Sequence, residues 1–251
     1  MPDYRVYCQP GTADPRELIL SPQESHHLIV VNRAQAGATV VAFDGHGIEW
    51  DTQLVKADKR AAQLLVRATR SATPLSYEID LAQALPKGTL MDSIVQKATE
   101  LGVRRILPLS SERSQVHLEG DRQERKIEKW QTAALEAAKQ CGNPWLPEIA
   151  PLQETTAFLR SAPSYEIALL ASLHSGARPL KSVLTAHRER HGRIPRRAVW
   201  LIGPEGDFSP SELAAAEAAG FLPVSLGPLV LRCETAAIVA IGILSHELQA
   251  P

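Results

Sequence analysis

Two loops in the last fifty residues hold the side chains best suited to chemistry. The first, Gly203-Pro204-Glu205-Gly206, follows an apolar run that predicts a strand. Glycine lets a ligand approach the backbone closely, so amide and carbonyl groups here could hydrogen-bond the edge of an adenine. From these four residues alone, a ligand loop and a tight strand–helix turn are equally good interpretations.

The second loop ends in Leu231-Arg232-Cys233-Glu234, directly before an apolar helix. Arg232 carries a planar fork of donors that suits a phosphate or a base carbonyl, and its apolar neighbours give it no structural task. Glu234 falls where the helix dipole favours a carboxylate, and capping of backbone amides is the simpler interpretation of this residue. We therefore predict that Arg232 meets a ligand.

Several other kinds of site are not indicated. No Gly-Lys-Ser/Thr follows the first loop and no GxGxxG opens a helix, which argues against phosphate-loop and dinucleotide sites. The three cysteines, Cys8, Cys141 and Cys233, are odd in number and far apart, which predicts free thiols. We expect no bound metal.

Strands alternate with helices from residue 75 onward, which predicts a mainly parallel sheet covered by helices. We expect strands at 79–85, 104–109, 167–172, 198–202 and 223–226, and helices at 90–101, 121–140, 180–190, 209–220 and 235–248. Both loops then follow carboxyl ends of strands, where open α/β sheets bind ligands. Thr89 with Asp92, and Ser209 with Glu212, are spaced as helix-capping pairs.

The first 72 residues form a β-rich region of their own. We expect a meander of strands at 38–43, 48–55 and 61–69, closed into a small barrel or half-barrel, with one helix at 22–32. The polar segment 70–74 ends in proline and is the best candidate linker. This pattern predicts two domains, 1–72 and 75–251.

The composition sets limits on location and partners. The formal net charge is −1 over 251 residues, so any surface for nucleic acid must come from local clusters of basic residues. No apolar run is long enough to span a membrane, and the first residues lack the features of a signal peptide. We expect a cytoplasmic protein that does not bind membranes.

The two loops and their flanks closely resemble the bacterial 16S ribosomal RNA uridine-N3 methyltransferase family, which belongs to the SPOUT class. The stretches that carry the resemblance are 201–209, 224–236, 87–88, 91–92, 96–103, 111–114, 136–142, 26–28 and 31–33 with Gly37. The chain departs from the family pattern at three positions. Asp207, Cys233 and Ala38 stand where glycine, threonine and aspartate are common.

The resemblance implies a fold, a cofactor and partners. It implies a PUA-like β-barrel domain on 1–72 and an α/β SPOUT domain with a trefoil knot on 75–251. The cofactor would be S-adenosylmethionine, the substrate 16S ribosomal RNA of the small subunit, and the active form a homodimer. The implied cofactor-binding residues are Leu173, Leu201, Ile202, Gly203, Pro204, Glu205, Gly206, Leu226, Gly227, Pro228, Leu231, Thr235 and Ala236.

The implied catalytic residues are Arg232, Glu205 and Glu234. Our hypothesis is that Arg232 stabilises charge on the uracil carbonyls, with Glu205 and Glu234 as candidates for the proton acceptor. The basic residues expected to contact RNA phosphates are Arg5, Arg33, Lys87, Lys97 and Arg113. Two alternatives stay open: a SPOUT ribose 2′-O-methyltransferase, or a non-catalytic RNA-binding protein of ribosome assembly.

Overall fold

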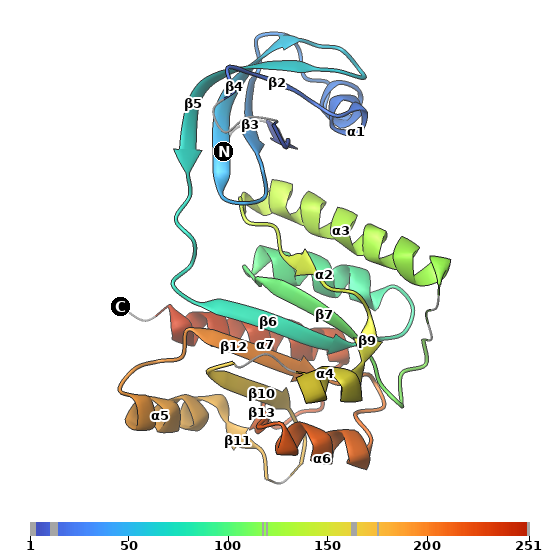
Figure 1. Ribbon diagram of the computed structural model, residues 1–251, viewed down its shortest axis with the longest axis vertical. Helices are drawn as coiled ribbons and strands as arrows, with labels where there is room; N and C mark the ends of the chain where they lie inside the picture. The colour runs from blue at the N-terminus through green and yellow to red at the C-terminus, as the bar shows by residue number, and fades with distance from the viewer. Residues whose placement is uncertain are drawn as a thin grey trace. The chain divides into compact units, whose positions relative to one another are not determined.

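The computed structural model describes residues 4–10, 15–116, 118, 120–161, 165–174 and 176–249. The chain forms two compact units (Figure 1). The N-terminal unit comprises Met1–Pro74 together with Leu135–Leu146, and the C-terminal unit comprises Leu75–Ala134 and Pro147–Pro251. The division into functional domains at 1–72 and 75–251 stays a prediction. No helix in the described part of the chain has the length and apolarity to cross a membrane.

The N-terminal unit is built on a curled five-stranded sheet in the order β1-β3-β4-β5-β2 (Figure 1). Its elements are β1 (Tyr4–Tyr7), β2 (Glu17–Ile19), α1 (Pro22–His26), the π-helical turn η1 (His27–Val31), β3 (Thr39–Phe43), β4 (Ile48–Lys56) and β5 (Gln63–Ser71). The predicted antiparallel meander is confirmed as β3-β4-β5. Trp50, Leu54 and Leu64 lie in the core beneath it.

The end of α3 (Asp121–Cys141) completes the N-terminal unit. The ammonium of Lys139 pairs with one carboxylate oxygen of Glu24, and Glu136 accepts from the same ammonium at 2.8 Å. The other oxygen of Glu24 accepts from the backbone N–H of Tyr7 at 3.0 Å. The side chains of Lys139 and Glu24 are only 6% and 5% exposed, so this ion pair is part of the unit's interior.

The C-terminal unit holds an eight-stranded sheet whose pairings are all parallel, which confirms the predicted architecture. In addition to part of α3, its elements are β6 (Glu78–Ala84), α2 (Leu90–Glu100), β7 (Arg105–Ser110), β8 (Glu148–Ile149), β9 (Gln153–Glu154), α4 (Thr155–Ser161), β10 (Ile167–Ala171), β11 (Arg178–Pro179), α5 (Leu180–His191), β12 (Arg197–Ile202), α6 (Pro210–Ala218), β13 (Leu222–Ser225) and α7 (Cys233–Leu248). The path through the sheet is β11-β13-β10-β12-β6-β7-β8, and β9 also pairs with β7.

Helices cover both faces of this sheet. Successive side chains of a strand point to opposite faces, so Trp200 and Leu201 on β12 enter different cores. Trp200 packs in a cluster with residues of α2, α5, α7 and the first part of α3. Leu201 packs with residues of α4 and α6, and with Phe208. β12 is therefore buried on both faces, which explains its continuous apolar sequence.

The two predicted capping pairs have different outcomes. At the start of α6, Ser209 and Glu212 form the reciprocal capping box, as the sequence predicts. At the start of α2, Thr89 makes no capping hydrogen bond, and the prediction was wrong. Asp92 instead accepts from the indole of Trp130 at 3.1 Å and from the ammonium of Lys129, both on α3.

Candidate functional site

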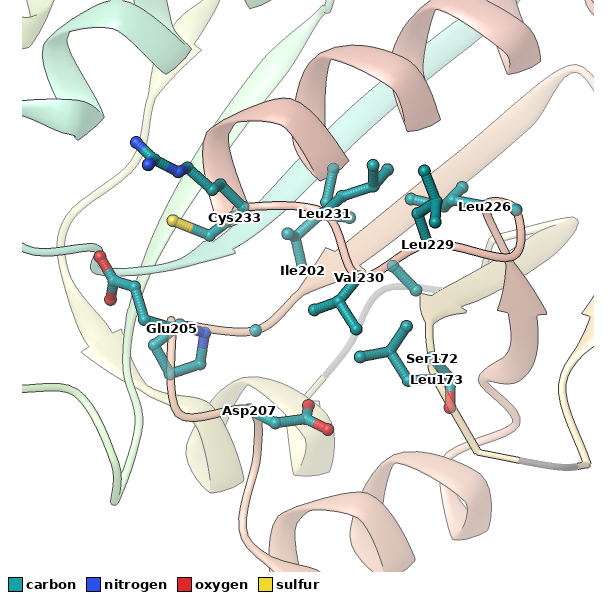
Figure 2. Close-up of a pocket in the computed structure, with 16 residues that line it drawn as sticks. Ser172, Leu173, Ile202, Glu205, Asp207, Leu226, Leu229, Val230, Leu231 and Cys233 are labelled. Carbon is teal, nitrogen blue, oxygen red and sulfur yellow. The ribbon is translucent and has the colours of Figure 1, made fainter.

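A cavity of about 300 Å³ opens at the carboxyl ends of β10, β12 and β13 (Figure 2). Three loops form it, each following one of these strands, and the start of α7 closes one side. The lining residues are Ala171, Ser172, Leu173, Ile202, Gly203, Pro204, Glu205, Asp207, Leu226, Gly227, Leu229, Val230, Leu231, Arg232, Cys233 and Ala236. Both loops that the sequence singled out therefore line one cavity of small-molecule size.

Most of the residues expected to bind the cofactor line this cavity. They are Leu173, Ile202, Gly203, Pro204, Glu205, Leu226, Gly227, Leu231 and Ala236. Leu201, Gly206, Pro228 and Thr235 are not among the lining residues. Leu201 is fully buried because it faces the core next to α6. Sequence reasoning missed Ala171, Ser172, Asp207, Leu229, Val230 and Cys233 as lining residues, although Asp207 directly follows the first loop and the last three lie within the second.

Gly203 lets the first loop fold back on itself. A Cβ at this position would lie 3.2 Å from Oδ1 of Asp207 and 3.3 Å from Cδ2 of Phe208, which is tight. Asp207 adopts a left-handed backbone conformation with φ of 58°. Its side chain stabilises this turn by accepting from the N–H of Phe208 at 2.8 Å. Asp207 thus adopts the left-handed conformation at a position where glycine is common in the family.

Glu205 and Cys233 lie on one side of the cavity (Figure 2). Oε1 of Glu205 accepts from the backbone N–H of Lys87 at 2.9 Å, which ties the loop after β12 to the loop after β6. Burial, together with Glu205 and Glu234, raises the pKa of the Cys233 thiol to about 12. The thiol donates to Oε2 of Glu234 at 3.4 Å. Cys233 therefore stays protonated at neutral pH and is no nucleophile.

A buried carboxylate fastens the segment Ser111–Ser114 to the start of α6. Glu212 is 2% exposed and accepts from Ser111 Oγ at 3.0 Å and from the N–H of Glu112 at 3.2 Å. It also accepts from the N–H of Ser209 at 2.9 Å. Nearby, Arg113 donates to the carbonyl of Gly206 at 3.0 Å. The loop after β7 therefore supports the loop after β12 from outside the cavity.

Arg232 is exposed and lines the cavity from the N-cap position of α7. Within the described residues its guanidinium makes no hydrogen bond or ion pair. Glu234 lies in the first turn of α7 but is not a lining residue. Of the two residues, only Arg232 lines the cavity, and its guanidinium has no partner among the described residues.

The five basic residues expected at phosphates lie in different surroundings. Arg5 is 11% exposed, pairs with Glu49 at 2.6 Å and stacks over Phe43 at 4.6 Å. Lys97 pairs with Glu100 at 2.9 Å, and Arg113 holds the carbonyl of Gly206. The side chains of Arg33 and Lys87 are exposed and without a partner in the part of the chain that the structure describes. Arg5 and Arg33 belong to the N-terminal unit, and Lys87, Lys97 and Arg113 belong to the C-terminal unit.

The mouth of the cavity has an apolar rim. Leu173, Leu229 and Val230 are 63%, 73% and 79% exposed, and all three line the cavity (Figure 2). Isolated exposed apolar residues are ordinary, but three of them around one opening indicate a surface that another molecule covers.

Comparison with known proteins identifies relatives over nearly the whole chain. An RNA methyltransferase domain matches residues 73–245, and an RNA methyltransferase PUA domain matches residues 20–67. Ribosomal RNA small subunit methyltransferase E of Synechocystis sp. is 32% identical over 247 residues, which cover 98% of this chain and 78% of that protein.

Two solved structures share the fold over almost their full length. A methyltransferase from Legionella pneumophila, in complex with the bound cofactor SAM, is 32% identical with a TM-score of 0.87 and covers 97% of each chain. The ribosomal RNA small subunit methyltransferase E from Neisseria gonorrhoeae, bound to S-adenosyl methionine, is 30% identical with a TM-score of 0.86 and covers 98% of each chain.

Proposed function

Because the chain belongs to the ribosomal RNA small subunit methyltransferase E family, we propose that it transfers a methyl group from S-adenosylmethionine to N3 of a uridine in 16S ribosomal RNA. Its fold is the α/β SPOUT fold preceded by a PUA-like domain. The observation that carries the proposal is the cavity at the ends of β10, β12 and β13, with the unpaired Arg232 on its wall.

The residues of the cavity fit S-adenosylmethionine. Ile202, Leu226 and Leu231 offer an apolar surface to an adenine ring, and Gly203 and Gly227 allow a ligand close to the backbone. Glu205 and Asp207 add carboxylates to the lining, which suits a ligand that carries a sulfonium and an ammonium. When bound, the cofactor supplies an electrophilic methyl group.

Arg232 has the task of stabilising charge on the substrate base. N3 of uridine carries a proton between two carbonyls, so its attack on a methyl group requires loss of that proton and places negative charge on O2 and O4. A guanidinium that is already free of partners meets this charge without first breaking a bond. Arg232 therefore orients the base and stabilises the transition state.

Glu205 is the better placed of the two candidate proton acceptors. It lines the cavity, and only Oε1 is engaged, by the N–H of Lys87. Glu234 lies outside the lining and accepts from the Cys233 thiol. We propose that Glu205 accepts the proton of N3 and that Glu234 has a structural role at the start of α7.

The remaining parts of the proposal concern partners and location. Residues 1–72 bind RNA and 75–251 carry catalysis and a trefoil knot. A second copy of the chain covers the rim of Leu173, Leu229 and Val230 in a homodimer. On α7, the side chains of Ala237, Ile241 and Leu244 are buried in the core of the C-terminal unit, and Ile243 is 36% exposed. The enzyme works in the cytoplasm on the small subunit or its RNA.

One experiment separates this proposal from its alternatives. The purified protein is incubated with methyl-labelled S-adenosylmethionine and 16S ribosomal RNA from a strain that lacks the corresponding gene. Nucleoside mass analysis should find 3-methyluridine. Methyl groups on ribose would indicate a 2′-O-methyltransferase, and RNA binding without any transfer would indicate an assembly protein.

A further inference from the structure

The N-terminal unit has a cavity of its own, separate from the proposed catalytic one. Its volume is about 310 Å³, and it lies between β1, both ends of η1 and the end of α3. The residues around it are Tyr4, Arg5, His27, Asn32, Glu136, Lys139 and Gln140. We propose that this cavity receives one unstacked base of a single-stranded segment of the RNA, an inference that rests on the proposed function.

The charges in the cavity wall are already neutralised. Lys139 pairs with Glu24 and Glu136, and Nη1 of Arg5 pairs with Glu49. A phosphate would find little net positive charge here, so the electrostatic attraction that dominates backbone binding is missing. The cavity therefore suits a neutral group with hydrogen-bonding edges.

Unused hydrogen-bonding groups and aromatic rings make up the rest of the wall. No described residue hydrogen-bonds the side-chain amides of Asn32 and Gln140 or the rings of Tyr4 and His27. Amides that read base edges, beside rings on which bases stack, are the chemistry of single-stranded RNA recognition.

Arg33 supplies the contrast that makes the proposal testable. It follows Asn32 directly, is exposed with φ of 56°, and has no partner for its side chain within the described chain. A phosphate next to the bound base would be its natural partner. Variants of Asn32 and Arg33 should therefore differ in the salt dependence of RNA binding. Loss of a phosphate contact lowers this dependence, and loss of a base contact does not.

The test measures binding of the full chain, without S-adenosylmethionine, to a fluorescent single-stranded RNA of mixed sequence and to the same strand annealed to its complement. Wild type should prefer the single strand. Asn32→Ala and Gln140→Ala should each weaken single-strand binding by roughly tenfold with an unchanged salt slope. Tyr4→Ala should do the same, and Tyr4→Phe should bind like wild type because it keeps the ring.

Two controls complete the design. Gln9→Ala, which removes an exposed amide of the same unit outside the cavity, should have no effect. Arg33→Ala should lower the salt slope by about one.

Three results would overturn the proposal of a base-binding cavity. They are equal affinity for single strand and duplex, wild-type affinity in the Asn32 and Gln140 variants, and a lower salt slope in those variants. Absence of methyl transfer by a wild-type protein that binds RNA in this way would overturn the proposed function alone.

Discussion

Replacing Glu212 by glutamine should destabilise the C-terminal unit and lower its affinity for S-adenosylmethionine. The buried carboxylate accepts three hydrogen bonds, from Ser209 N, Glu112 N and Ser111 Oγ. Glutamine has the same shape but only one acceptor atom, so its NH₂ group must face at least one of these donors. An unmatched buried donor costs about 2 kcal/mol, and loss of the charge from the remaining bonds costs about 1 kcal/mol more.

The expected total of about 3 kcal/mol corresponds to a fall in melting temperature of roughly 6–12 °C for a chain of this size. Differential scanning fluorimetry measures this, and calorimetry should show weaker binding of S-adenosylmethionine, because the loop after β12 loses its support. Glu217→Gln is the matched control, since this residue is exposed on the same helix. If Glu212→Gln melts like the control and binds cofactor like wild type, the support by Ser111–Ser114 is not needed and the reasoning fails.

Three further predictions address the cavity itself. Arg232→Ala should lower kcat by about 10²–10³-fold in single-turnover assays with little change in S-adenosylmethionine affinity, and Arg232→Lys should recover part of the loss. A loss confined to RNA affinity would make Arg232 a positioning contact. Gly203→Val should give a folded protein that binds no S-adenosylmethionine by calorimetry, because the new side chain meets Asp207 and Phe208 and displaces the loop that lines the cavity. Unchanged affinity would refute the assignment of this loop. The Cys233 thiol, with its pKa raised from 9.0 to about 12, should resist iodoacetamide in the folded chain at pH 8, as read by peptide mass spectrometry. Since the raised pKa favours the neutral thiol, its contribution to stability is complete below pH 9 and is lost as pH rises toward 12. Rapid alkylation at pH 8 without unfolding would contradict this.

The main elements of the fold could be predicted because their patterns are long and periodic. The helix at 90–101 and the strand at 198–202 appear within one residue of their predicted limits, as α2 and β12. The sequence shows no comparable signal for β8, β9 and β11, which have two residues each. β1 pairs in parallel with β3, more than thirty residues along the chain, and such a contact leaves no trace in local periodicity.

The site could be located from the glycines and Arg232, but the partners of individual side chains could not. Asp92 has the spacing of a capping residue, yet Trp130 and Lys129 on another helix offer it stronger donors. Arg113 resembles a free surface cation in the sequence, and the carbonyl of Gly206 engages it in the structure. Each of these contacts joins residues that only the tertiary fold brings together, so spacing along the chain contains no information about them.

The membership of residues 135–146 in the N-terminal unit has a consequence for synthesis on the ribosome. Residues 1–74 are made first, but Glu24 obtains its buried cation only when Lys139 has been added, 115 positions later. At ordinary elongation rates, the chain between residues 74 and 146 takes roughly 4 to 14 s to make. During that interval the curled sheet lacks the helix end that covers Glu24, and a buried carboxylate without its cation is strongly disfavoured.

The N-terminal unit is therefore expected to mature late, although its strands are translated first. A ribosome stalled before residue 135 should expose a nascent chain that proteases cut readily within residues 15–74. A ribosome stalled well beyond residue 146 should expose the same region in a resistant form. Order along the gene and order of folding are thus reversed for this unit, because its last structural part is encoded inside the segment that builds the other one.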